Sequence, residues 1–139
     1  MFFIALILIL ISFLSGSTMY SYIIPKLLKG VDITEISDDK NPDAGNVIKH
    51  CGIISGLLCI ILDLFKAFIP VFISIKYFNI SNITLVIIAI APVLGHAYSP
   101  FLKFHGGKAI AATFGTFLAL YPMSYVALTF ALILMDYCF

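Results

Sequence analysis

Long uncharged apolar runs dominate this chain and limit what it can fold into. The first runs from residue 2 to residue 24 without a charged side chain. Crossing the hydrocarbon core of a bilayer takes about 20 helical residues, so this run is long enough to span a membrane. No basic residue precedes it, and its apolar character continues past Ser15-Gly16-Ser17. Both observations favour a spanning helix over a cleaved signal peptide.

The composition excludes several classes of protein. Apolar residues make up 62% of the 139 residues and charged residues only 11%, with a mean hydropathy of +1.13. Soluble domains are about 45–50% apolar and about 25% charged. The net charge of +1 provides no basic field for a polyanion. A soluble enzyme, a disordered tail and a nucleic-acid binder are therefore excluded, and membrane lipid is the expected surrounding.

Four further apolar segments follow the first. They cover residues 52–77, 83–102, 109–121 and 123–139. We therefore predict an all-α integral membrane helical bundle, a single domain over residues 1–139 with about five transmembrane helices. Pro122 separates the last two segments, which can alternatively form one kinked helix.

Lysines predict how the chain is oriented, because it contains no arginine. The loop at residues 25–51 carries Lys26, Lys29, Lys40 and Lys49, the loop at 103–108 carries Lys103 and Lys108, and the intervening loop has only Lys76. Lysine-rich short loops remain cytoplasmic. We expect loops 25–51 and 103–108 inside, the N-terminus outside, and a multi-pass protein of the bacterial inner or plasma membrane. Two distant loops on one side can then build one site.

The loop at residues 103–108 suggests an anion site. Gly106 and Gly107 lie between two lysines at the expected start of a helix. Glycines let backbone N–H groups approach a ligand, a helix N-terminus favours negative charge, and Lys108 adds a full positive charge. Phosphate is the commonest such anion. The alternative is a pair of snorkelling lysines beside a flexible turn at the membrane edge.

The end of the first loop carries a second polar group of residues. Asn41, Asn46 and Lys49 precede the second apolar segment. These side chains and the intervening glycine are able to form another cradle for an anion. An ordinary turn rich in asparagine and aspartate explains the same residues.

Ionisable residues inside apolar segments mark two further candidates. Asp63 and Lys66 are three residues apart and share one helix face. Hydrocarbon forces such groups to pair or to line a polar interior, so they form an internal ion pair or a polar path to a site. His96 either makes a hydrogen bond between helices or orients a substrate or a loop.

No metal or cofactor is expected. The three cysteines, Cys51, Cys59 and Cys138, form no CxxC pair, which argues against zinc and against a disulfide framework. No nucleophile, paired carboxylates or catalytic triad stands out, so no catalytic residue is assigned.

Taken together, these motifs resemble the bacterial acyl-phosphate:glycerol-3-phosphate acyltransferases, the PlsY-type membrane enzymes. Residues 29–33 are similar to that family's KGxDIR, residues 41–49 to GSGNPGATNVLR, residues 62–66 to LDxxKG, and residues 94–96 with 101–108 to LGHxFPxFLKFKGGKG. The last of these motifs is the most specific.

The resemblance implies a membrane enzyme of phospholipid biosynthesis. Its partners would be acyl phosphate, which donates the acyl chain, and glycerol 3-phosphate, which becomes lysophosphatidic acid. Carried over by position, the substrate- and phosphate-binding residues are Asn41, Asn46 and Lys49 in the first motif and His96, Gly106, Gly107 and Lys108 in the second. Asp63 and Lys66 would support the site from their helix.

The chain also departs from that pattern. Asp38-Asp39-Lys40 stands where the family has Gly-Ser-Gly, and Asp43 replaces a glycine. An anionic Asp39 is expected to repel phosphate. The chain ends at Phe139, ahead of the family's third polar motif, so we expect a C-terminally truncated member. The alternatives are an inactive or split member that acts as an anion-binding membrane subunit with a separate C-terminal fragment, and a small transport protein.

Overall fold

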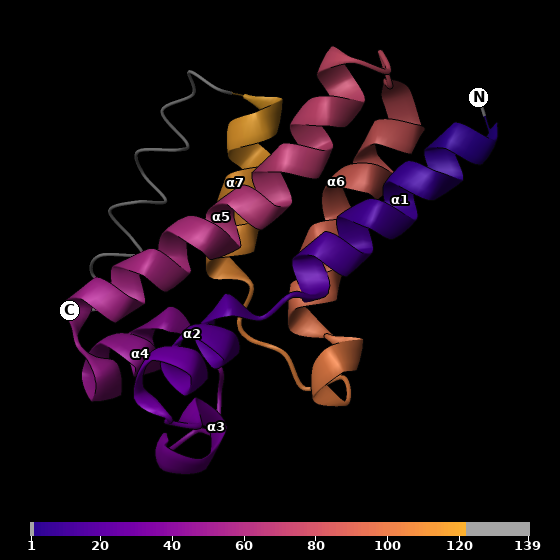
Figure 1. Ribbon diagram of the computed structural model, residues 1–139. Helices are drawn as coiled ribbons and strands as arrows, with labels where there is room; N and C mark the ends of the chain where they lie inside the picture. Colours follow the sequence, from indigo (N-terminus) through magenta and orange to yellow (C-terminus); the bar gives the residue numbers. More distant parts are fainter. Residues whose placement is uncertain (1, 122–139) are drawn as a thin grey trace.

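The computed structural model describes residues 2–121, and every regular element in that range is helical (Figure 1). The elements are α1 (Phe2–Ser17), α2 (Tyr20–Lys29), α3 (Ile33–Ile36), α4 (Ala44–Cys51), α5 (Ile53–Lys76), α6 (Asn82–Ala97), the 3-10 turn η1 (Pro100–Leu102) and α7 (Ile110–Leu120). The all-α prediction is therefore confirmed for the described part of the chain.

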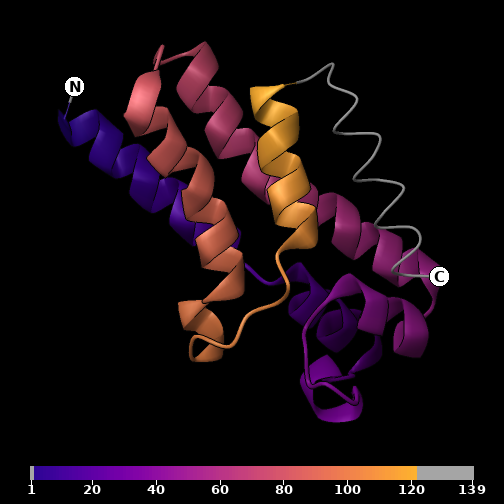
Figure 2. The same cartoon turned by 180° about the vertical axis from the view of Figure 1, so that it is seen from behind.

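Four longer helices form the bundle, and the polar segments lie together at one end of it. Helix α1 packs on α6 and α5, and α7 packs on α5 and α6. The short helices α2, α3 and α4 gather at the same end as η1 and the loop that enters α7 (Figures 1 and 2). The two loops that the lysine pattern assigned to one side therefore do lie at one end.

Two of these helices are long and apolar enough to cross a membrane. Helix α5 has 24 residues with mean hydropathy 2.3, and Asn82–Leu102, which joins α6 to η1, has 21 residues with mean hydropathy 1.8. Large side chains on α5, such as Ile54 and Ile61, remain exposed for lipid to cover. Helix α7, with 11 residues, is shorter than a span, and residues 123–139 lie outside the described residues. The number of five spans stays a prediction.

The first apolar run differs from the single helix expected over residues 2–24. The structure divides it at Thr18 and Met19 into α1 and α2, bent by 43°. The small polar residues before the break favour such a bend, since the Ser17 hydroxyl donates to the Phe13 carbonyl at 2.7 Å within its own helix. If the bent pair counts as one span, the described residues contain three candidate spans.

Side chains from α5 and from the segment after α6 bind the carbonyl groups that the break leaves free. The Lys66 ammonium donates to the Thr18 carbonyl, and the Ser99 hydroxyl donates to the Ser17 carbonyl at 2.7 Å. Lipid supplies no hydrogen bonds, so an unpaired carbonyl there would cost several kcal/mol. These contacts hold the broken helix against α5 and the end of α6.

Of the two alternatives for Asp63 and Lys66, the internal ion pair is present, and it lies at this break. Lys66 Nζ lies 2.7 Å from Asp63 Oδ1, and the two side chains are 2% and 3% exposed. Ser21 of α2 donates to the other carboxylate oxygen of Asp63 at 3.1 Å. The pair therefore joins α5 to the break and to α2.

Replacing Lys66 by methionine should destabilise the fold by about 3 kcal/mol, because it leaves Asp63 buried without its counter-charge. The double variant Asp63→Asn/Lys66→Met should be more stable than Lys66→Met alone, since it removes that stranded charge. Thermal unfolding in detergent, followed by circular dichroism, measures both. A double variant less stable than the single one would contradict this account, and Lys76→Met, on an exposed residue, is the control.

Glycines bring α1 and α6 into backbone contact. A Cβ atom at Gly16 would lie 2.1 Å from the Pro92 carbonyl oxygen, and one at Gly95 would lie 2.2 Å from the Phe13 carbonyl oxygen. No side chain fits at these distances. The close approach places the end of α6, and the loop that follows it, beside the break in the first span.

We therefore expect Gly16→Ala to separate α1 from α6 and to destabilise the protein by about 1–3 kcal/mol. Ile11→Ala, on an α1 side chain that is 51% exposed, should change stability far less. Thermal unfolding of the two variants compares them directly. Equal midpoints would show that the helices are not packed as closely as described.

Candidate phosphate-binding site

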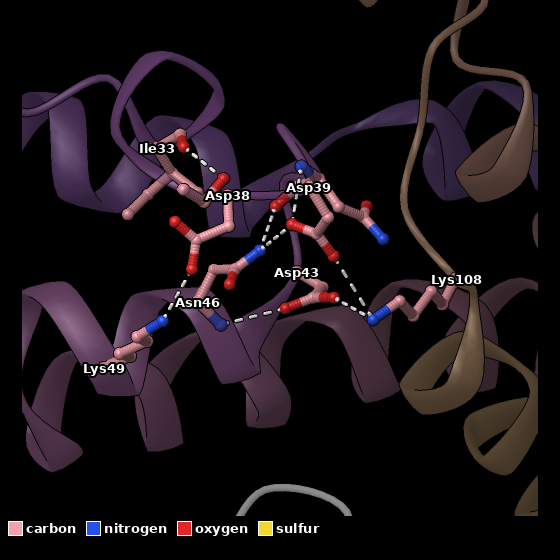
Figure 3. Close-up of polar contacts among 9 residues, drawn as sticks. Ile33, Asp38, Asp39, Asp43, Asn46, Lys49 and Lys108 are labelled. Atoms are coloured by element: carbon pink, nitrogen blue, oxygen red, sulfur yellow. Dashed lines mark hydrogen bonds and ion pairs between the residues drawn. The ribbon is translucent and has the colours of Figure 1, made fainter.

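Ionic contacts join the two polar loops. The Lys108 ammonium, just before α7, lies 3.2 Å from Asp43 Oδ2 and 3.5 Å from Asp39 Oδ2 (Figure 3). Residues about 65 positions apart in the sequence thus meet at one point. The convergence of the two loops, on which the phosphate hypothesis depends, is present.

The first loop is shaped by its own hydrogen bonds. Asp43 caps α4, and its Oδ1 accepts from the Asn46 backbone N–H at 2.9 Å. The Asn46 side-chain amide donates to Asp39 Oδ1 and to the Asn41 carbonyl, both at 2.8 Å. Asp39 Oδ1 also accepts from the Asn41 backbone N–H at 3.2 Å. Asn41, Asn46 and Lys108 are therefore gathered around Asp39 (Figure 3).

Two carboxyl groups of this loop are stabilised in their charged form. The hydrogen bond from the Asn46 side chain holds the pKa of Asp39 below its ordinary value, with further contributions from the Asn41 N–H and Lys108. The hydrogen bond from Lys49 lowers the pKa of Asp38 in the same way. Lys49 Nζ lies 2.9 Å from Asp38 Oδ2, and both side chains are exposed. Lys49 therefore pairs with Asp38 rather than facing Lys108.

The glycines of the second motif, Gly106 and Gly107, have a different role from the one expected. Their N–H groups do not face a ligand, because Gly106 donates to the Ala97 carbonyl and Gly107 to the His96 carbonyl, each at 3.1 Å. A Cβ atom would lie 1.8 Å from the His96 carbonyl oxygen at Gly106, and 2.5 Å from His96 Nε2 at Gly107. Helix α7 begins only at Ile110. The glycines therefore let the loop lie against the end of α6, which positions Lys108.

A small cavity lies beneath Lys108. It has a volume of about 40 Å³ and is lined by Asp43, Asp63, His96, Lys108 and the first residues of α7. This is room for a water molecule or a hydroxyl group. His96 is 3% exposed, and its Nδ1 has no hydrogen-bond partner among the described residues. The cavity therefore links the paired loops to the ion pair of α5.

The contacts of Asp39 and Asp43 with Lys108 were missed by the sequence interpretation, which treated Asp39 only as a charge that repels phosphate. The signal was present, because two acidic residues and a lysine lie in loops assigned to the same side. Ser21, the partner of Asp63, carried no comparable signal. Among residues 2–121, no group of three or more His, Cys, Asp or Glu side chains is arranged to hold a metal ion.

The family model described as glycerol-3-phosphate acyltransferase matches residues 6–139. This chain belongs to that family. Glycerol-3-phosphate acyltransferase 1 of Thermotoga maritima is 46% identical over 110 residues, which are 78% of this chain and 53% of the relative. The Aquifex aeolicus glycerol-3-phosphate acyltransferase is 39% identical over 118 residues, 85% of this chain and 60% of the relative. The chain thus spans between half and two thirds of these relatives.

Two solved structures share the fold. Both are described as PlsY (YgiH), an integral membrane glycerol 3-phosphate acyltransferase, in a glycerol 3-phosphate form and a lysophosphatidic acid form. The TM-scores are 0.81 and 0.79, at 39% identity, over 90% of this chain and 60% of theirs. The described helices are therefore those of an integral membrane protein.

Asn46→Ala should raise the pKa of Asp39 toward its ordinary range, because the amide that stabilises the carboxylate is lost. Because the pKa of Asp39 is lowered in the folded protein, its ionised carboxylate stabilises the loop at pH values above the ordinary aspartate pKa. This stabilisation is lost as the pH falls through the lowered pKa. In the variant it should be lost at a higher pH. Carbon-13 NMR titration of the aspartate carboxyl groups measures the shift. Asp38, held by Lys49, is the internal control, and an unmoved Asp39 would contradict the assignment.

Proposed function

We propose that this chain is a glycerol-3-phosphate acyltransferase that uses acyl phosphate and forms lysophosphatidic acid in phospholipid biosynthesis. Family membership supports the reaction class. The single observation that carries the site is the meeting of Lys108 with residues 39–46 at one end of an apolar bundle. That arrangement brings a fixed cation and amide donors to the level where a lipid headgroup would lie.

The proposed reaction replaces the mixed-anhydride bond of acyl phosphate by an ester bond. A hydroxyl oxygen of glycerol 3-phosphate attacks the acyl carbon of acyl phosphate, a new carbon–oxygen bond forms, and the bond from the acyl carbon to phosphate breaks. The departing phosphate accepts the hydroxyl proton. The protein's role is to hold two anionic substrates in contact, and such positioning alone lowers a barrier by several kcal/mol.

The charged and polar residues of the two loops supply that positioning. Lys108 neutralises phosphate charge, and the side-chain amides of Asn41 and Asn46 donate hydrogen bonds. Lys49 provides a second cation at the edge of the same loop. Gly106 and Gly107 act by shaping the loop that carries Lys108, and His96 orients it from below. Asp63 and Lys66 support the site by fixing α5 to the broken first span.

The location in the bundle suggests where the substrates meet. Glycerol 3-phosphate would enter from the cytoplasm between loops 25–51 and 103–108. The acyl chain of acyl phosphate would remain in the bilayer, beside the exposed apolar side chains. We therefore place the protein in the bacterial inner or plasma membrane, with these two loops inside.

The ion contacts of Lys108 favour a second candidate, an anion-binding member without catalysis. Asp39 and Asp43 already neutralise this lysine. Vesicles with the purified chain, acyl phosphate and labelled glycerol 3-phosphate separate the two functions, because only the enzyme yields labelled lysophosphatidic acid. Product that appears only when the C-terminal part of the Thermotoga maritima relative is supplied would identify a split enzyme with a separate fragment.

In the same vesicles, Lys108→Met should lower the rate of lysophosphatidic acid formation by about 10²-fold, the effect typical of removing one electrostatic contact to a reacting group. Lys76→Met makes the same change of charge on an exposed residue at the other end of α5 and should leave the rate unchanged. A Lys108→Met variant as active as its control would place the phosphate elsewhere.

A further inference from the structure

A single carboxylate contacts three of the residues assigned to the phosphate, and it meets Asn41 through the backbone N–H. Asp39 accepts from the Asn46 amide at 2.8 Å and from the Asn41 N–H at 3.2 Å, and its other oxygen lies 3.5 Å from Lys108 Nζ. Asn41, Asn46 and Lys108 are three of the residues proposed to bind substrate. In this state of the protein, all three are bound to an anion that belongs to the chain itself (Figure 3).

The neighbouring acidic residues complete the pattern. Asp43 Oδ2 lies 3.2 Å from the same ammonium, and Asp38 pairs with Lys49 at 2.9 Å. The acidic stretch therefore neutralises both lysines of the proposed site. Charge-assisted hydrogen bonds of this kind are the ones a phosphate oxygen would make.

The two carboxylates differ in how readily they can move. The Asp39 side chain is 47% exposed and can turn into water without leaving a buried charge. The Asp43 side chain is 17% exposed, and its other oxygen caps α4. A ligand can therefore displace Asp39 from Lys108. Asp43 stays in place and continues to neutralise part of the charge of the Lys108 ammonium.

We propose that Asp39 is an internal ligand of the phosphate site, released when a phosphate monoester binds, and that Asp39 and Asp43 together determine which anions bind there. The proposal rests on the proposed function, because it concerns the same site. A phosphate monoester carries about −1.5 to −2 charges at neutral pH. It competes with a carboxylate for Lys108 more strongly than a singly charged anion does. The acidic pair thereby weakens the binding of every anion, so that a phosphate monoester, which Lys108 attracts more strongly, still binds whereas a phosphodiester does not.

The test measures binding of two probes, inorganic phosphate and dimethyl phosphate, at pH 8 by calorimetry in detergent. The unaltered chain should bind phosphate weakly and dimethyl phosphate not at all. Asp39→Asn keeps the size of the side chain and removes its charge. It should bind phosphate about tenfold more tightly and should now bind dimethyl phosphate, because the repulsion and the competition are both lost. Asp43→Asn, which preserves the helix cap, should add to the effect.

Two controls separate this mechanism from a general change in charge. Glu35→Gln alters the net charge equally at an exposed residue of α3 and should leave both affinities unchanged. In a Lys108→Met background, Asp39→Asn should give no gain, because the cation for which the anions compete is gone. Circular dichroism confirms that each variant keeps its helices.

Every outcome bears on the proposal. An unchanged phosphate affinity in Asp39→Asn, no phosphate binding by any variant, or a gain that persists without Lys108 would each overturn it. A different result would contradict the proposed function alone. In that case phosphate binding would follow the expected pattern, but no lysophosphatidic acid would form. Formation of product with no effect of Asp39 on phosphate binding would overturn the internal ligand alone.

Discussion

Much of the described structure depends on how the carbonyl groups at the break between α1 and α2 are bound. Lipid offers them no hydrogen bonds, so the donors must come from the protein. Lys66 supplies one, and its contact with Asp63 holds that lysine in place. Because Asp63 also lines the cavity beneath Lys108, the support of the bundle and the floor of the proposed site share one ion pair.

The break also explains why the polar elements lie together. It turns α2 away from the axis of α1, so that α2, α3 and α4 form a layer at the end of the bundle instead of extending the first span. The glycine contact between α1 and α6 fixes the end of α6 beside this layer. The loop carrying Lys108 then reaches residues 39–43 without a long connection.

The sequence predicted the helical class and the close approach of the two loops, and it gave an ion pair between Asp63 and Lys66 as one of two alternatives. These follow from hydropathy, lysine counting and helix periodicity, which are local properties. It did not predict the break at Thr18, because Ser15, Gly16 and Ser17 are tolerated within apolar helices and only tertiary donors make a break stable. Nor did it predict that the Gly106 and Gly107 N–H groups bind carbonyl groups at the end of α6. That contact depends on how the loop folds back against the helix, which no local pattern in the sequence indicates.

The contacts of Asp39 have a consequence for how the site responds to its surroundings. A competitor tethered to the same chain has a fixed effective concentration, which dilution of the protein does not alter. The ligand concentration needed for half occupancy therefore rises by a factor that the tether sets. In the proposed mechanism, the length and stiffness of residues 38–43 would determine how far Asp39 raises that concentration.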